Sequence, residues 1–166
     1  MEKYVDYDNG FYVELGANDG VNQSNSLYFE LNRNWKGVLV EPSPYNFFLC
    51  REQRSNKNRI FCNACVGFDY EDKYVDIKYA NLMSISENLA LDLEDKEAHL
   101  ESSKAHLKET ETVFAFGAVA KTLNSLLEKA EAPKVIDFLS LDVEGAELEV
   151  LKGINIKGDN YNSETL

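Results

Sequence analysis

Four short, largely apolar runs constrain the fold of this chain most strongly. They occupy residues 11–15, 37–41, 59–66 and 135–142, and Gly16 and Pro42 end the first two. Runs of this kind, which do not alternate with polar residues, are typical of parallel strands in a sheet that is covered on both faces. We therefore expect the four segments to form the strands of one parallel sheet.

Helical patterns lie between these runs. Ser43 and Pro44 place a capping residue before a first-turn proline and predict a helix over residues 44–54. Apolar residues recur at helical spacing over residues 123–130 and 146–154. This alternation predicts a doubly wound, mostly parallel α/β sheet of the Rossmann-like type, in a single domain spanning residues 1–166.

Two segments depart from the alternation. Residues 73–79 and 112–116 have the composition of additional strands. Between them, residues 86–111 are polar and carry only a thin apolar stripe, formed by Leu89, Leu93, Leu100 and Leu107. We expect a helical insertion at about 86–111, weakly amphipathic or mobile, that lies over the carboxyl ends of the strands as a lid or acceptor-binding element.

The charge balance excludes several classes of partner. The chain has 17 basic and 29 acidic residues, which gives a net charge of −12. Nucleic acid is disfavoured because that affinity comes mainly from cationic contacts to phosphates, and an anionic membrane surface is disfavoured too. No apolar run approaches the ~20 residues of a membrane span, and the first residues lack the basic and apolar regions of a signal peptide. We expect a cytoplasmic protein.

The number of cysteines also favours a cytoplasmic location. Cys50, Cys62 and Cys65 are an odd, low count that fits a reducing environment better than a disulfide scaffold. Cys62 and Cys65 form a Cys-x-x-Cys string, which suggests redox chemistry or zinc. The string lies inside a predicted strand, where residues three apart point to opposite faces, and no second pair completes a zinc site. We interpret the cysteines as structural and predict no metal site.

The turn after the first predicted strand contains residues that indicate a ligand-binding site. Gly16 and Gly20 frame a tight turn whose glycines allow a ligand to approach the backbone. Their Gly-x-x-x-Gly spacing differs from that of dinucleotide binders and of phosphate-binding loops. The acids Glu14 and Asp19 suit a cationic or hydroxyl-rich ligand, and Glu41, at the end of the second strand, can accept two hydrogen bonds from a ribose diol. Together they indicate a pocket for S-adenosylmethionine.

Three sequence blocks carry a resemblance to a known family. Residues 10–20, 35–44 and 136–153, with residues 122–127 before the last block, resemble the FkbM-type methyltransferases. That family depends on S-adenosylmethionine and mostly methylates hydroxyl groups of sugars, polyketides and related natural products. The resemblance implies O-methylation of a hydroxyl on a sugar, glycan or natural-product acceptor.

The resemblance also implies a cofactor site built from separate segments. The loop after the first strand and the start of the next helix would supply the contacts to the methionine moiety: Glu14, Gly16, Ala17, Asn18, Gly20, Ser24 and Asn25. Glu41 would bind the ribose, and Asn63 and Ala64 would lie beside the adenine. Asp142 and Glu144 would face the transferable methyl group.

The acidic pair leaves two interpretations open, which are compatible. Asp142 and Glu144 can orient the acceptor hydroxyl and take its proton, or they can cap the helix that begins near Gly145, where acids favour the positive end of the helix dipole. His99 and His106 are the only histidines, so either is a candidate general base or a solvated surface residue. We expect the pair to contribute position more than a particular base.

The end of the chain departs from the family pattern. A full sheet of this class has seven strands, the last three after the helix that ends near Gly153, whereas only residues 154–166 follow here. We expect the sheet to lack its last three strands, so that the chain is a truncated copy, a fragment, or one that completes its sheet by other means. Residues 135–142 would then lie at an edge that promotes self-association. The rival function is a non-catalytic S-adenosylmethionine-binding module or partner subunit.

Overall fold

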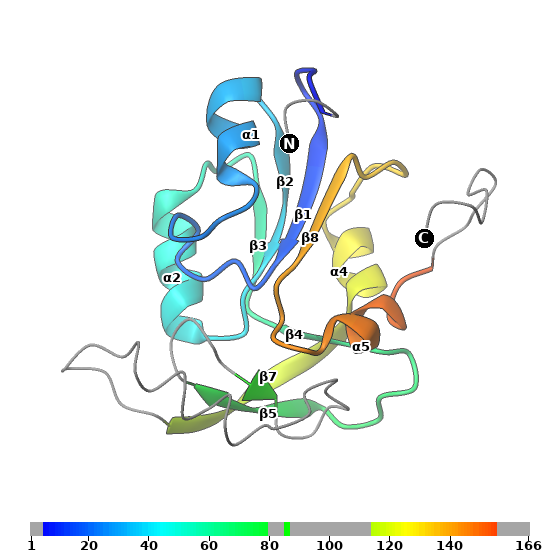
Figure 1. Cartoon of the computed structure of the whole chain (residues 1–166). Helices are drawn as coiled ribbons and strands as arrows, with labels where there is room; N and C mark the ends of the chain where they lie inside the picture. The colour runs from blue at the N-terminus through cyan, green and yellow to red at the C-terminus, as the bar shows by residue number, and fades with distance from the viewer. Residues whose placement is uncertain (1–4, 80–84, 87–113, 156–166) are drawn as a thin grey trace.

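The computed structural model describes residues 5–79, 85–86 and 114–155, and its centre is a parallel four-stranded sheet (Figure 1). The strands of this main sheet are β1 (Phe11–Leu15), β2 (Lys36–Val40), β3 (Arg59–Phe61) and β8 (Phe138–Leu141). Their order is β3-β2-β1-β8, with Val13 paired to Val38 on one side and to Leu139 on the other. The predicted Rossmann-like α/β fold is confirmed, because strands and helices alternate along this sheet.

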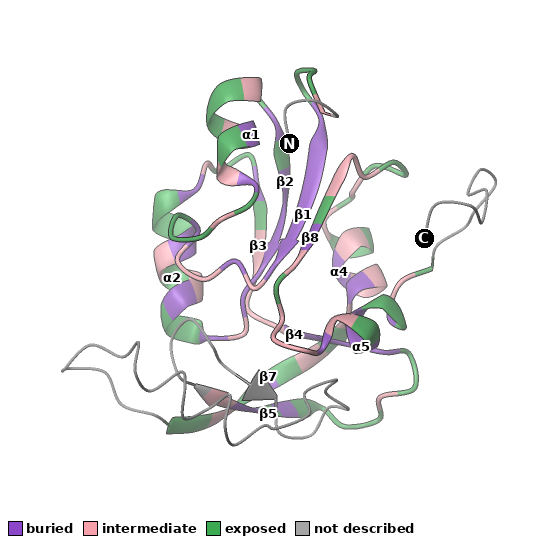
Figure 2. Ribbon diagram, in the orientation of Figure 1, coloured by how far each residue is buried: buried purple, intermediate pink, exposed green. Residues whose placement is uncertain are grey.

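Helices cover both faces of the main sheet, which explains its uninterrupted apolar strands. On one face lie α1 (Leu27–Arg33) and α2 (Pro44–Gln53), and on the other lie α4 (Leu123–Lys129) and α5 (Glu147–Leu151) (Figure 1). Residues that alternate along β1 pack into two separate hydrophobic cores. Val13 and Leu15 pack with Leu123 of α4, whereas Tyr12 packs with Phe29 of α1. Figure 2 shows β1 buried along its length, as its position in the middle of the sheet requires.

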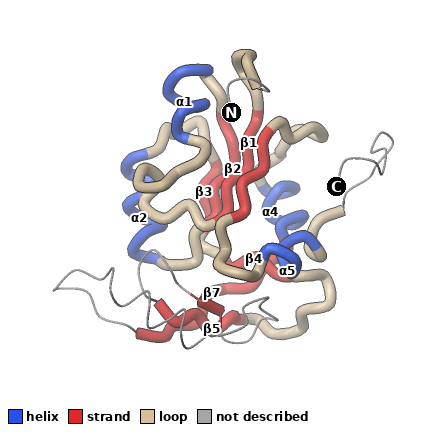
Figure 3. Tube along the Cα trace, in the orientation of Figure 1, coloured by secondary structure: helices blue, strands red, loops and turns tan. Residues whose placement is uncertain are grey.

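A second sheet lies across the carboxyl ends of the main strands (Figure 3). It consists of β4 (Ala64–Val66), β7 (Phe114–Thr122), β5 (Tyr74–Tyr79) and β6 (Ile85–Ser86), in that order. The strands β5 and β7 pair antiparallel, and β4 pairs parallel to β7. Ala64, Val75 and Ala118 form its core together with Ala146, which immediately precedes α5. The second sheet is thereby fixed against the end of the main sheet.

The structure corrects the predicted strand over residues 59–66. This segment forms β3 and β4, which belong to different sheets and are separated by Cys62 and Asn63. The first part pairs with β2 and the second with β7, so the chain crosses here from the main sheet to the second sheet. An apolar run does not reveal such a crossing, because both halves are strands.

The additional strands differ in extent from their predictions. The strand predicted over 73–79 is β5, and the one predicted over 112–116 is β7, which continues to Thr122. Gly117, Ala118 and Ala120 have low strand propensity, but this stretch pairs with both β5 and β4. Of the insertion predicted at 86–111, only Ser86 lies among the described residues, as the last residue of β6.

Within the described residues, no helix has the length and apolar character needed to cross a membrane.

Candidate functional site

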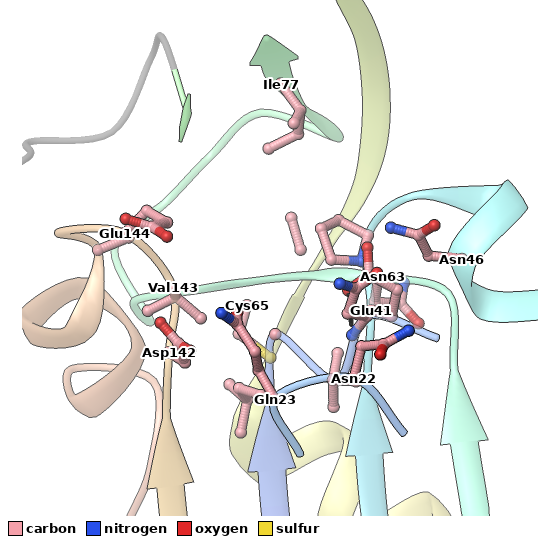
Figure 4. Close-up of a pocket in the computed structure, with 17 residues that line it drawn as sticks. Asn22, Gln23, Glu41, Asn46, Asn63, Cys65, Ile77, Asp142, Val143 and Glu144 are labelled. Atoms are coloured by element: carbon pink, nitrogen blue, oxygen red, sulfur yellow. Dashed lines mark hydrogen bonds between the residues drawn. The ribbon is translucent and has the colours of Figure 1, made fainter. Parts of the chain in front are cut away.

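A pocket lies where the carboxyl ends of the main strands face the second sheet (Figure 4). The predicted site residues that line it come from four segments that are distant in the sequence: Gly16, Asn18, Glu41, Asn63, Ala64, Asp142 and Glu144. Ile77 of β5 lines the pocket from the second sheet. This is the end of an open α/β sheet at which ligands bind, because the loops diverge there.

Gly16 is required by the packing of the protein itself. Its φ is +75°, a left-handed conformation, and a Cβ atom at this position would lie 1.9 Å from the backbone oxygen of Asp142. The backbone N–H of Asp142 donates to the oxygen of Leu15 at 3.1 Å. The missing side chain therefore lets the end of β8 close onto the turn after β1, which brings Asp142 to the pocket wall.

Glu41 presents a buried carboxylate to the pocket. The residue is 6% exposed, and its two oxygens accept backbone N–H groups from Asn18 and Ser43, each at 2.9 Å. Burial raises the pKa of Glu41 to about 7, although these two hydrogen bonds act in the opposite direction. Each carboxylate oxygen has two lone pairs, so Glu41 retains the capacity to accept hydrogen bonds from a ligand.

Glu14 lies behind the pocket and organises the loop. It is buried at 2% exposure and accepts hydrogen bonds from the Ser24 hydroxyl at 2.9 Å, the Asn25 backbone at 2.7 Å and the Ser26 hydroxyl at 2.5 Å. The Asn25 side chain donates to the Ser140 hydroxyl at 3.0 Å. The structure therefore places Glu14, Ser24 and Asn25 in a network that fixes the loop, and their contact with a cofactor stays a prediction.

Two further predicted residues also lie away from the pocket lining. Ala17 is buried at 1% exposure and packs in the core beside α1. Gly20 has a φ of +83°, and a Cβ atom there would lie 2.8 Å from Cγ of Arg54 and 2.9 Å from Sγ of Cys50. Gly20 is thus needed because α2 packs against the loop, whereas the sequence pattern suggested the close approach of a ligand.

The acidic segment after β8 forms the opposite wall. Figure 4 shows Asp142 and Glu144 on the same side of the pocket, flanking Val143. Asp142 is an exposed residue, yet partial desolvation, followed by the charges of Glu147 and Glu14, raises its pKa. A carboxylate with a raised pKa is a better proton acceptor than an ordinary aspartate.

The backbone of this segment is held by a different acid. The carboxylate of Glu147 accepts hydrogen bonds from the N–H groups of Val143 at 3.4 Å and Gly145 at 3.3 Å. The N-cap position of α5 is Ala146. Glu147 therefore organises this turn and the pair borders the pocket, while a helix-capping role of Asp142 and Glu144 stays a prediction.

Three amide side chains of the pocket were not predicted. Asn22, Gln23 and Asn46 line it, and Figure 4 shows Gln23 between Asp142 and Asn22. The carboxylate of Asp19 accepts the backbone N–H of Asn22 at 2.8 Å, which forms the tight local turn that aspartate favours. Asp19 followed by Asn22 was the available signal, but it predicts a turn and not the direction of the side chains.

The described lining residues are acidic or neutral. They include the carboxylates of Glu41, Asp142 and Glu144, and none of them is lysine, arginine or histidine. The candidate bases His99 and His106 lie outside the described residues. In the part of the chain that the structure describes, no group of three or more His, Cys, Asp and Glu side chains could hold a metal ion. The charge suits a cationic or hydroxyl-rich ligand.

The cysteines do not form a pair. The Cys62 thiol contacts the Pro42 backbone oxygen at 3.7 Å, whereas Cys65 is buried and lines the pocket. Burial raises the pKa of Cys65 to about 12, so its sulfur is a protonated thiol at neutral pH. All three cysteines are free of disulfides.

Comparison with known proteins gives one family. A family model described as the methyltransferase FkbM domain matches residues 14–163. Neither the curated proteins nor the solved structures gave a match.

Proposed function

From the premise that this chain belongs to the FkbM methyltransferase family, we propose that it transfers a methyl group from S-adenosylmethionine to a hydroxyl of a sugar, glycan or natural-product acceptor. The observation that carries this proposal is the position of the carboxylates. Glu41 lies at the end of β2, and Asp142 and Glu144 lie at the end of β8, all lining one pocket.

The residues present fit S-adenosylmethionine. Glu41 has oxygens at the pocket wall that suit a ribose diol. The acids at the end of β8 suit a sulfonium or an ammonium, because an opposite charge within a few ångströms is favourable. A dinucleotide such as NAD carries phosphates, which the carboxylates would repel. The pocket therefore supports S-adenosylmethionine over a phosphate-bearing cofactor.

The chain's own contribution would be alignment and proton removal. When bound, S-adenosylmethionine supplies a methyl group that is already activated by a sulfonium. Asn63 and Ala64 would bind beside the adenine and Glu41 would hold the ribose, which fixes one partner of an in-line transfer. Asp142 or Glu144 would orient the acceptor hydroxyl, and the raised pKa of Asp142 supports it as the group that takes the proton.

Calorimetry on the folded chain tests the proposal. We expect binding of S-adenosylmethionine and S-adenosylhomocysteine, and much weaker binding of NAD. Transfer of labelled methyl from S-adenosylmethionine to a panel of hydroxylated acceptors then tests catalysis. Absence of binding to both sulfur ligands would reject the proposal. Binding without transfer to any acceptor would favour the non-catalytic module instead.

A further inference from the structure

Arg54 is a buried cation that the pocket chemistry does not use. It is the C-cap residue of α2, and its side chain is fully buried. A guanidinium has five N–H donors in a fixed planar fork. In Arg54, all three nitrogens have acceptors within the protein, and these acceptors divide into two groups on different segments of the chain.

The first group anchors the guanidinium. Nε donates to the carboxylate of Glu30 on α1 at 2.7 Å, and one terminal nitrogen donates to the Tyr12 hydroxyl of β1 at 2.7 Å. Glu30 also accepts hydrogen bonds from the Ser55 backbone at 2.8 Å and from the Asn58 side chain at 2.7 Å. Although burial acts to raise it, the hydrogen bonds from Ser55, Arg54 and Tyr12 and the charge of Arg54 hold the pKa of Glu30 below its ordinary value. The anchor is therefore an ion pair of Arg54 and Glu30 that is supported by further hydrogen bonds.

The second group belongs to the loop that borders the pocket. The terminal nitrogens of Arg54 donate to the Gly20 backbone oxygen at 2.9 Å, to the Ser24 hydroxyl at 3.0 Å and to the Ser26 hydroxyl at 2.9 Å. Glu14, which holds the same serines, lies 3.5 Å from Arg54. One guanidinium thus fixes the loop at three points.

The loop presents a different set of residues to the pocket. Asn18, Asn22 and Gln23 line it, and they alternate along the sequence with the positions that contact Arg54. Asn18 and Gln23 have φ values of +48° and +60°, a left-handed conformation that is uncommon for non-glycine residues. Gln23 directly precedes Ser24, which accepts a hydrogen bond from Arg54, and Asn18 lies two residues before Gly20, which does the same.

We propose that Arg54 is a positioning residue for the cofactor: through Gly20, Ser24 and Ser26 it sets the conformation in which Asn18, Asn22 and Gln23 meet the ligand. The inference rests on the proposed function, because it names how the same pocket is shaped. It predicts that weakening these contacts lowers cofactor affinity even though Arg54 itself is outside the pocket lining.

Arg54→Lys and Ser26→Ala test the proposal on the whole chain. Lysine keeps the charge but lacks the fork, and Ser26→Ala removes the hydrogen bonds of Ser26 with Arg54 and with Glu14 while leaving the anchor intact. Without ligand, hydrogen exchange of the amides of residues 18–26 should accelerate in both variants. The dissociation constant of S-adenosylhomocysteine should rise by roughly ten-fold in Arg54→Lys if only about a tenth of the molecules keep the competent loop conformation, because apparent affinity falls with that fraction.

Asp137→Asn is the matched control. Asp137 accepts hydrogen bonds from the Tyr7 hydroxyl at 2.6 Å and the Phe11 backbone at 2.8 Å, at the opposite end of β1 from the pocket. This variant should lose stability in urea without faster exchange in residues 18–26 and without weaker ligand binding. A role of Arg54 in general stability alone would make it behave like this control.

The outcomes separate the two proposals. If both Arg54→Lys and Ser26→Ala fold and show wild-type exchange over residues 18–26 and wild-type affinity, the inference is wrong. If Arg54→Lys does not fold, Ser26→Ala and Glu30→Gln, which loosens the anchor, decide it by the same two measurements. If the wild-type chain binds no S-adenosylhomocysteine, the proposed function fails, and exchange of residues 18–26 still shows whether Arg54 fixes the loop.

Discussion

The carboxylate of Glu41 should make ligand binding depend on pH near neutrality. Burial raises its pKa to about 7, and the ionised form is the better acceptor for ribose hydroxyls. The affinity for S-adenosylhomocysteine should therefore fall as the pH decreases from 8 to 6, approaching about ten-fold per unit below the pKa. Glu41→Gln should bind more weakly at pH 8 and show little pH dependence in calorimetry. Glu52→Gln, at an exposed position on α2, should keep the wild-type profile, and the same profile in Glu41→Gln would contradict the assignment.

The same group should also shape the stability of the ligand-free chain. The pKa of Glu41 lies above the ordinary value of 4.5, so the folded state retains a proton that the unfolded chain has lost between pH 4.5 and 7. The contribution to stability is complete below pH 4.5 and is lost as the pH rises through 7, by up to about 3 kcal/mol. Urea unfolding at pH 5 and pH 8 should show this loss in the wild type and not in Glu41→Gln. If both proteins lose the same stability between pH 5 and pH 8, groups other than Glu41 control the pH dependence.

Gly16→Ala should disrupt the junction between the first and last strands of the main sheet. The new Cβ would lie 1.9 Å from the Asp142 backbone oxygen and would sit at a φ of +75°, so the end of β8 must move. We expect a loss of about 2 kcal/mol or more, since the left-handed conformation alone costs about 1–2 kcal/mol. Gly117→Ala is the control, because its nearest neighbour would be Tyr74 Cβ at 3.6 Å. Urea midpoints that shift equally in the two variants would contradict this explanation.

Among the elements, β7 of the second sheet continues directly into α4. The Thr122 hydroxyl accepts the Ser125 backbone N–H at 3.3 Å and caps α4 where β7 ends. Thr122→Ala should lower the free energy of unfolding by about 1 kcal/mol, the usual effect of losing an N-cap. Thr122→Ser keeps the acceptor oxygen and should retain most of the stability in the same denaturant titration. An alanine variant as stable as the serine variant would show that the cap contributes little.

Helices and strands could be predicted from the sequence where a capping signal, helical periodicity or a continuous apolar run is clear. The helix over 44–54 follows from Ser43 and Pro44, and α2 occupies Pro44–Gln53 with Ser43 as its N-cap. In α1, by contrast, Phe29 is the only residue that is buried, so no apolar stripe marks the helix. The crossing between β3 and β4 was hidden for the opposite reason, since both segments are equally strand-like.

The site was predictable in part for a related reason. Glu41 and Asp142 directly follow the ends of apolar strands. A residue at the carboxyl end of a predicted strand is expected at the edge of the sheet where ligands bind. Arg54 carries no such signal, because Arg51 lies one helical turn earlier with the same chemistry. The structure leaves Arg51 exposed over the Phe47 ring and buries Arg54 among partners from β1, α1 and the loop. Those partners are set by tertiary packing, which local sequence does not encode.

Taken as one molecule, the chain combines a strong negative charge with an open strand edge. β8 pairs with β1, and among the described residues no strand lies on its other side. Leu139 on this strand is 38% exposed. An uncovered strand with apolar side chains is a template for pairing with another chain. The net charge of −12 opposes association, but its repulsion is screened within about 8 Å at physiological ionic strength.

We therefore expect the chain to self-associate through β8, more strongly at higher salt. Sedimentation velocity over a range of protein concentrations, at low and at physiological ionic strength, should show a species larger than the monomer. The fraction of this species should increase with protein concentration and with ionic strength. Leu139→Lys should weaken the association, because a charged residue on an edge strand opposes pairing. Val135→Lys makes the same change at an exposed position outside the strand and should have a smaller effect. A monomer under all conditions, with a two-state unfolding transition, would mean that the β8 edge is covered within the chain itself.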